Sequence, residues 1–288
     1  MSGRTARRRV VRVTLSTDGQ GDAPAVRSTA RADLLAGEEP LGIRVGGTAL
    51  SMTMRTPGDD LDLAAGFLVG EAIVGSPDDI AGMKVCDGTS CGHLDHAEGE
   101  IGNVVDVTLA PGVTVPAAAR RSFLTTSACG VCGKTSIDDI CVLPKAPLTA
   151  DATVFAPAMI TAMPDRLREA QRVFDSTGGL HAAGLFTAAG ELLAVREDVG
   201  RHNAVDKIVG WALLNAKLPL AGCALLVSGR ASFELVQKAV LAGIPLLAAV
   251  SAPSSLAAEL ADEAGLTLIG FLRGPSMNVY AGAHRVGL

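Results

Sequence analysis

Short apolar segments alternate with amphipathic ones in the last third of the chain, and this order restricts the fold more than any other feature. The apolar segments Cys223 to Ser228, Pro245 to Val250 and Thr267 to Phe271 have the length of buried strands. Helical patterns at Ser232 to Ala242 and Ser254 to Ala264 separate them. Two strand–helix–strand connections in succession predict parallel strands in one sheet that helices cover.

The segments before this run extend the same α/β domain. Two apolar stretches, His181 to Thr187 and Leu192 to Glu197, flank a glycine-containing turn and predict a hairpin. An amphipathic helix is expected from Asn203 to Leu214. Another is expected from Ala158 to Phe174, and Pro164 should bend or restart it.

The first part of the chain predicts a smaller α+β unit. Leu41 to Val45, Met52 to Thr56 and Val104 to Leu109 have the alternation of strands. The pair Asp59-Asp60 supplies a cap for a helix from Leu61 to Ile73.

These patterns divide the chain into four parts. Residues 1–35 are expected to be a flexible N-terminal segment with one strand, Val10 to Leu15, and the basic run Arg7-Arg8-Arg9 is expected to be a solvated, disordered start. Residues 36–126 form the α+β domain and 127–150 a loop and linker. Residues 151–288 form the C-terminal α/β domain.

Composition restricts the function classes. The net charge of −5 argues against a protein whose main partner is nucleic acid. Gly, Pro or charged residues break the apolar runs, so no membrane-spanning helix is expected, and no signal peptide is visible. Six cysteines in 288 residues are too few for a disulfide scaffold, and we expect a cytoplasmic protein.

The strongest chemical signal is Cys129-Gly-Val-Cys132-Gly-Lys134, which places two thiols three positions apart among glycines. Glycine gives an exposed backbone that another molecule can approach. A cation near a thiol favours the nucleophilic thiolate. The motif therefore predicts sulfur chemistry by transfer between proteins.

Zinc binding is the alternative for these cysteines. Cys86 and Cys91, with two histidines nearby, have a spacing that suits a tetrahedral site shared with the Cys129/Cys132 pair. The cation at Lys134 is unfavourable beside a closed thiolate–metal site, so we expect no bound metal.

A charged cluster, Arg196-Glu-Asp-Val-Gly-Arg-His-Asn203, ends one predicted strand and opens the next helix. One interpretation is a salt-bridged junction between strand and helix. The other is an anion site, because Gly200, Arg201 and His202 present amides and cations at a helix N-terminus. The pattern leaves both open.

Three polar loops follow the three parallel strands, and parallel strands place such loops on one edge of a sheet, where ligands bind. Serine and glycine before a helix suit a phosphate, but neither GxGxxG nor P-loop spacing is present. The loops are Ser228-Gly229-Arg230-Ala-Ser232, Ser251-Ala-Pro-Ser-Ser255 and Arg273-Gly274-Pro275.

With these motifs taken together, the chain resembles the formate dehydrogenase accessory sulfurtransferase family (FdhD/NarQ) from about residue 38 to its end. The matching segments are Met54-Arg-Thr-Pro-Gly-Asp-Asp-Leu61, Gly66-Phe-Leu68, Cys129-Gly-Val-Cys132-Gly, Thr177-Gly-Gly-Leu-His181, Arg196 to Lys207, Ser228 to Lys238, Ala242-Gly-Ile-Pro245, Val250-Ser-Ala-Pro-Ser-Ser255, Gly270-Phe-Leu-Arg-Gly274 and Asn278-Val-Tyr280.

The resemblance implies a sulfur carrier. Such proteins accept sulfur from a cysteine desulfurase as a persulfide, here with Cys129 as carrier and Cys132 as relay or resolving partner. They deliver it to the molybdenum or tungsten bis-guanine-dinucleotide cofactor of formate dehydrogenase. The resemblance also implies a C-terminal domain similar in fold to cytidine deaminases but without their zinc site, and the H-x-E…P-C-x-x-C signature of those enzymes is absent here.

The cofactor site implied by the resemblance is a short segment after the last predicted strand. We add to it Arg201, His202, Ser228, Gly229, Arg230 and Ser232, and we expect GDP to serve as a surrogate ligand and the chain to form a homodimer. A zinc-stabilised cofactor-binding chaperone without sulfur transfer is the alternative, and the role of Cys86 and Cys91 stays open. The implied segment is Phe271, Leu272, Arg273, Gly274, Pro275 and Ser276.

Overall fold

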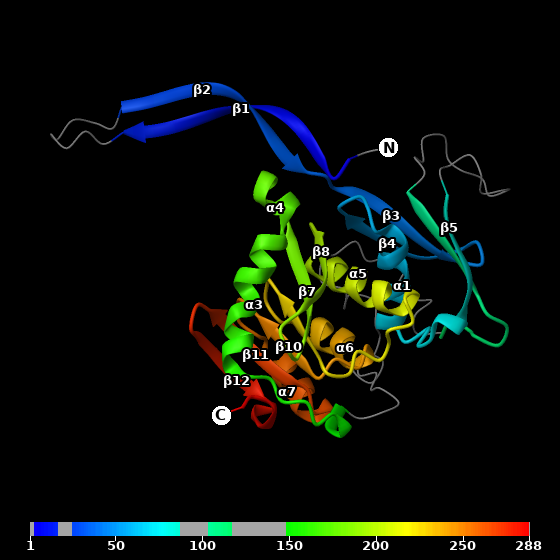
Figure 1. Cartoon of the computed structure of the whole chain (residues 1–288). Coiled ribbons are helices and arrows are strands. Elements are labelled where there is room, and N and C mark those ends of the chain that lie inside the picture. The colour runs from blue at the N-terminus through cyan, green and yellow to red at the C-terminus, as the bar shows by residue number, and fades with distance from the viewer. Residues whose placement is uncertain (1–2, 17–24, 87–102, 117–147, 288) are drawn as a thin grey trace.

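The computed structural model describes residues 3–16, 25–86, 103–116 and 148–287 (Figure 1). The Cys129/Cys132 motif, Lys134 and Cys91 lie outside the described residues. Within the described part the fold is mixed α/β with three sheets, and no helix there is long and apolar enough to cross a membrane.

The largest sheet belongs to the C-terminal region and has six strands in the order β12-β11-β10-β9-β7-β8. The central strands β9, β10 and β11 are parallel, as predicted, and β7 and β12 run antiparallel to their neighbours. The strands are β7 (His181–Thr187), β8 (Leu192–Asp198), β9 (Cys223–Val227), β10 (Leu246–Ala249), β11 (Thr267–Arg273) and β12 (Ser276–Ala281).

Helices cover both faces of this sheet because its central strands are apolar on both sides. Leu225 packs in the core that α5, α6 and α7 share, whereas Leu226 packs in a second core against α3. The result is three layers, as expected; similarity to cytidine deaminases stays a prediction. The helices are α3 (Pro157–Ala170), α4 (Arg172–Thr177), α5 (Arg201–Leu214), α6 (Phe233–Leu241) and α7 (Ser255–Ala264).

The expected single helix over Ala158 to Phe174 is two helices, α3 and α4, and the break lies at Gln171 rather than at Pro164. Pro164 stays inside α3. The amides of Val173 and Phe174 donate to the carboxylate of Glu197 at 3.0 and 2.7 Å. This carboxylate on β8 supplies acceptors for the first turn of a new helix, and so favours the break.

A smaller sheet forms the N-terminal region, with strand order β4-β3-β6-β5. The three predicted strands are present, and β5 is an addition: its residues are mostly exposed and show no period-2 alternation that would reveal a strand. The strands are β3 (Glu39–Val45), β4 (Thr48–Arg55), β5 (Ile80–Cys86) and β6 (Val104–Leu109).

The first residues are not a disordered start. They form a two-stranded antiparallel ribbon of β1 (Thr5–Ser16) and β2 (Ala25–Ala36), and Arg7-Arg8-Arg9 lies within β1. Its base is fixed to the body, because Arg4 pairs with Asp59 at 2.6 Å and the amide of Gly37 donates to the Arg4 carbonyl at 2.7 Å. Figure 1 shows the ribbon extending away from the body.

The two predicted domains share one core, which α1 (Asp60–Gly70) and α5 join (Figure 1). The helices cross with their backbones in contact. A Cβ placed on Gly66 would lie 1.8 Å from the carbonyl oxygen of Asp206, and one on Gly210 would lie 1.8 Å from that of Asp62. Only glycine fits at either position, so this crossing fixes how the smaller sheet sits on the larger one.

We predict that Gly210→Ala lowers the free energy of unfolding by about 3 kcal/mol or more, because the added methyl group forces the two backbones apart. Alanine stabilises a helix by about 1 kcal/mol relative to glycine. Without the close helix crossing, Gly210→Ala would therefore raise the free energy of unfolding. Urea unfolding measures the change. Gly82→Ala, where nothing lies within 4 Å of the added Cβ, is the control; equal stability of both variants contradicts the crossing.

Candidate functional site

The three polar loops meet, as the sequence predicts, at the carboxyl edge of β9, β10 and β11, and we call these loops the rim. The amide of Ser251 donates to the Gly229 carbonyl at 3.3 Å, and the amide of Phe271 donates to the Ser251 carbonyl at 3.1 Å. The amide of Ser254 donates to the Ala231 carbonyl at 3.0 Å. Backbone hydrogen bonds thus hold the loops in a fixed order along one edge.

A buried ion pair lies beside the rim, at the turn from β8 to α5. Lys207 Nζ is 2.7 Å from Asp198 Oδ2, and the two side chains are 1% and 0% exposed. Asp198 also accepts from the amide of Thr56 at 3.0 Å, the amide of Gly200 at 2.8 Å and the side chain of Asn203 at 2.9 Å. For these residues the structural interpretation of the charged cluster holds.

The remaining members of that cluster, Arg201 and His202, begin α5 and face the rim. His202 is engaged: its Nε2 lies 2.6 Å from Glu234 Oε2 and 3.2 Å from Ser232 Oγ. Arg201 differs, because its buried Nε has no hydrogen-bond partner within the described residues. A buried donor without a partner is costly, so an anion at this point would complete its hydrogen bonding.

His181, at the start of β7, is the residue of this site that reasoning from loops missed. A Cβ on Gly229 would lie 3.4 Å from His181 Nδ1 and 3.7 Å from Arg201 Cδ, at ordinary contact distance, so both side chains lie beside this loop of the rim. Burial lowers the pKa of His181, and the positive charges of Arg201 and His202 lower it further. The matching segment Thr177-Gly-Gly-Leu-His181 was its signal in the sequence.

Ser228 completes this corner. Its hydroxyl oxygen accepts from the amide of Ala182 at 2.9 Å, which leaves the hydroxyl hydrogen available to a ligand. With His181, Arg201 and Gly229 it forms what we call the anion corner, which consists of two nitrogen-bearing side chains, a hydroxyl group and the backbone of a glycine.

The predicted segment from Phe271 to Ser276 is the hairpin that joins β11 to β12. Leu272 is fully buried in the core next to α3, so only its backbone can contact a ligand. Gly274, Pro275 and Ser276 are exposed at the turn, and Arg230 is exposed on the neighbouring loop. Arg273 is exposed too, and its Nε donates to the Val250 carbonyl at 3.0 Å.

Two aromatic side chains accompany this hairpin. Phe271 has a left-handed backbone, with φ of 52°, and is 40% exposed. Tyr280 is 39% exposed, and a Cβ on Gly270 would lie 3.0 Å from its ring. Exposed aromatic faces suit a nucleobase, which stacks on them.

The two cysteines within the described residues, Cys86 and Cys223, do not lie in this candidate site. Cys86 is buried at the end of β5 and is disulfide-bonded. Cys223 is free and half-buried, and burial raises the pKa of its thiol. In the described ranges no three His, Cys, Asp or Glu side chains gather as metal ligands; the other cysteines of the proposed zinc site fall outside those ranges, so the zinc interpretation stays untested.

Comparison with known families decides the relationship. A sequence model described as the FdhD/NarQ family matches residues 36–287. The chain belongs to the FdhD/NarQ family. The match covers both sheets of the body and the whole rim, and it begins at the last residue of the ribbon.

Curated members of the family cover nearly the whole chain. Proteins called sulfur carrier protein FdhD from Nocardia farcinica and Streptomyces avermitilis are 55% and 57% identical, over 99% of this chain and 96% of theirs. That from Mycobacterium tuberculosis is 54% identical over 89% of this chain and 92% of its own.

The crystal structure of a candidate formate dehydrogenase accessory protein from Desulfotalea psychrophila has the same fold. Its TM-score is 0.69 and its sequence identity 23%, over 96% of this chain and 99% of that chain. At this identity the likeness shows the fold alone.

The lowered pKa of His181 predicts a pH-dependent stability. The folded state favours the neutral ring, so stability falls as pH drops below the ordinary histidine pKa of about 6.5. Between about pH 7.5 and about pH 5.5 the wild type should lose more free energy of unfolding than His181→Gln does. Urea unfolding at both pH values measures this; equal losses would show that His181 titrates normally.

Proposed function

We propose that this member of the FdhD/NarQ family is a sulfur carrier that takes persulfide sulfur from a cysteine desulfurase and delivers it to the molybdenum or tungsten bis-guanine-dinucleotide cofactor. Formate dehydrogenase is the client that needs this sulfur. The names of the relatives support the carrier role, and the anion corner with its neighbouring aromatic side chains supports a dinucleotide as the acceptor.

The carrier chemistry falls to Cys129 and Cys132. The Cys129 thiolate attacks the outer sulfur of the desulfurase persulfide, and the desulfurase thiolate leaves, so Cys129 becomes the persulfide. If Cys132 then attacks the inner sulfur, hydrosulfide is released towards the metal and a Cys129–Cys132 disulfide remains. An external thiol reduces this disulfide before the next cycle. Lys134 nearby favours the anionic form of each sulfur.

The acceptor binds at the rim. Its phosphates carry negative charge, and the anion corner offers Arg201, whose buried Nε has no partner within the described residues. This unsatisfied donor is the observation that carries the proposal, because it favours a ligand with an acceptor oxygen at that point. Arg230 and Arg273 are exposed on the adjoining loops and add positive charge.

The guanine base has a place on the same edge. Phe271 and Tyr280 present exposed aromatic faces beside the rim, and stacking is worth about 1–3 kcal/mol per base. A purine base and a diphosphate would then be recognised by different groups. GDP, which contains both, is the appropriate surrogate for half of the cofactor.

This function predicts two separable sites. Incubation with a cysteine desulfurase and cysteine should add one sulfur atom, seen by mass spectrometry and removed by a thiol reductant; Cys129→Ala should abolish the addition and leave GDP affinity unchanged. Arg201→Gln should weaken GDP binding about ten- to a hundredfold, the loss of one charge-assisted contact, and load sulfur normally. Calorimetry measures the GDP affinity.

Arg172→Gln, which removes an exposed arginine at the start of α4, is the control for charge and should bind GDP as the wild type does. Arg230→Ala and Arg273→Ala should have smaller effects than Arg201→Gln, because their charges are in solvent. Full loading of the Cys129→Ala, Cys132→Ala double variant would refute the carrier role. If the wild type binds stoichiometric zinc and the Cys129→Ala, Cys132→Ala double variant does not, the chaperone alternative is favoured.

A further inference from the structure

Helices α5 and α6 contact each other through two ion pairs that lie one helical turn apart. His202 Nε2 is 2.6 Å from Glu234 Oε2, and Lys238 Nζ is 2.6 Å from Asp206 Oδ1. Each helix supplies two residues four positions apart, which share one face of a helix, and the order of acid and base reverses between the pairs. We call these four residues the ladder. It joins the first two turns of α5 to those of α6.

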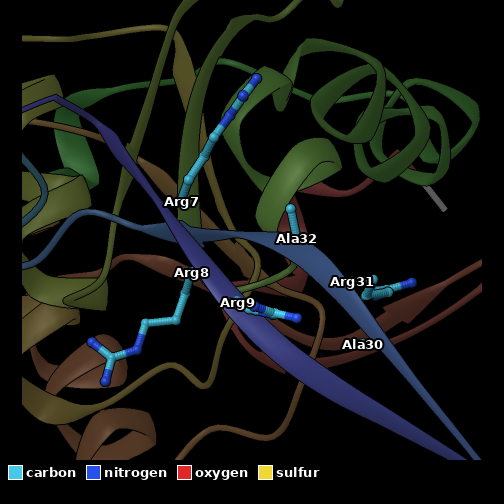
Figure 2. Close-up of a pocket in the computed structure, with 6 residues that line it drawn as sticks. All are labelled: Arg7, Arg8, Arg9, Ala30, Arg31 and Ala32. Atoms are coloured by element: carbon cyan, nitrogen blue, oxygen red, sulfur yellow. The ribbon is translucent and has the colours of Figure 1, made fainter.

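The ladder is shielded from solvent, unlike an ion pair on the ribbon. The side chains of His202 and Glu234 are 16% and 15% exposed, and those of the second pair 11% and 5%. Arg31 and Asp33 on the ribbon are 47% and 39% exposed, and Figure 2 shows Arg31 extending from the ribbon beside an arginine-lined pocket. Exposed pairs contribute little to stability, whereas loss of one partner from a buried pair leaves an uncompensated charge. The ladder can therefore fix the position of its helices.

The two pairs of the ladder also act on each other. Burial raises the pKa of Asp206, and the positive charges of Lys238 and His202 act in the opposite direction. The backbone of Asp206 lies at the helix crossing, where its carbonyl oxygen is in contact with Gly66. The ladder thus continues the tight packing of the crossing towards the first turn of α5 and the rim.

Ser232 shows that the contact with His202 takes the place of a helix cap. It is the N-cap residue of α6, but its side chain makes no capping hydrogen bond and lies 3.2 Å from His202 Nε2. Ser254 has the same place before α7, and its hydroxyl oxygen accepts from the amide of Ala257 at 3.2 Å. A serine at an N-cap stabilises its helix in that way. At α6 the serine contacts His202 instead.

The first pair of the ladder connects the two parts of the anion corner. Arg201 precedes His202 in the first turn of α5, and Gly229 belongs to the loop that Ser232 ends. Arg201 Cδ would lie 3.7 Å from a Cβ placed on Gly229. A shift of the first turn of α5 relative to this loop would change that distance, and with it the place of the Arg201 Nε.

We propose that Glu234 is a positioning residue for the anion corner: it holds His202, and through His202 it holds Arg201 where a diphosphate binds. This inference rests on the proposed binding of a dinucleotide at the rim. Glu234 acts without touching the ligand, because a carboxylate beside a phosphate would repel it. The ligand group that Glu234 serves is the diphosphate and not the base.

The test is the affinity of full-length variants for GDP and for inorganic diphosphate, measured by calorimetry. Glu234→Ala should weaken both about tenfold, at the lower end of the loss expected for Arg201→Gln, because the arginine stays but is no longer held in place. The two losses should be equal, since inorganic diphosphate has no base. A merely structural Glu234 would leave both affinities of the folded protein unchanged.

A second variant shows how Glu234 acts, and a third is the control. When His202→Ala is already present, Glu234→Ala should cause no further loss, because the carboxylate acts only through the histidine. Asp33→Ala also removes a carboxylate and breaks an ion pair, but on the ribbon, and it should bind both ligands as the wild type does. Thermal melting verifies that each variant is folded. If Glu234→Ala does not fold, Glu234→Gln keeps the size of the side chain and should weaken both ligands about threefold or more.

The outcomes separate this inference from the proposed function. Unchanged affinities of the Glu234 variants, losses that add to those of His202→Ala, or a greater loss for GDP than for inorganic diphosphate would each overturn the positioning role, while the proposed function stands. A wild type that binds inorganic diphosphate but not GDP, with the loss in Glu234→Ala, would support the positioning role and refute the guanine dinucleotide as acceptor. A wild type that binds neither ligand overturns both.

Discussion

The Asp198 carboxylate is the point on which the rest of the structure depends. It is fully buried and binds Lys207, Asn203 and the amide of Gly200 at the start of α5, as well as the amide of Thr56 before α1. A buried ion pair gives little net stability, but loss of one partner costs about 3–5 kcal/mol. The pair therefore acts mainly to specify position: it joins the β4–α1 turn to the β8–α5 turn and so sets the helix crossing at Gly66 and Gly210.

The same turn sets the candidate site. The amide of Gly200, the residue before α5, donates to Asp198. Helix α5 therefore begins at Arg201, and Arg201 and His202 occupy its first two positions and face the rim. His202 contacts Glu234 and Ser232 within the protein, whereas the buried Arg201 Nε has no hydrogen-bond partner among the described residues, and we propose that a ligand supplies it. One short charged segment thus contains both a structural ion pair and the cation that we propose binds the ligand.

The sequence predicted the parallel strands because Leu225, Leu247 and their neighbours form continuous apolar runs that only a doubly covered strand needs. It also predicted that the polar loops converge, since that follows from parallel strands alone. It did not predict β5, which buries little, and of the ribbon it predicted only a strand from Val10 to Leu15, which lies within β1, because the arginine-rich partner strand contributes no side chains to the core. His181 was missed because its contact with Gly229 joins residues 48 positions apart in the chain, and no local pattern reports such a contact.

We propose that sulfur held on the Cys129/Cys132 motif reaches an acceptor that the anion corner positions. Activation of formate dehydrogenase that holds its cofactor without the added sulfur tests this most directly, with persulfide-loaded protein as the sole sulfur source. Wild type and Arg201→Gln, loaded to the same level, should differ in the rate of activation by about tenfold or more, because only the wild type holds the acceptor well. Equal rates from the two loaded proteins would contradict the account.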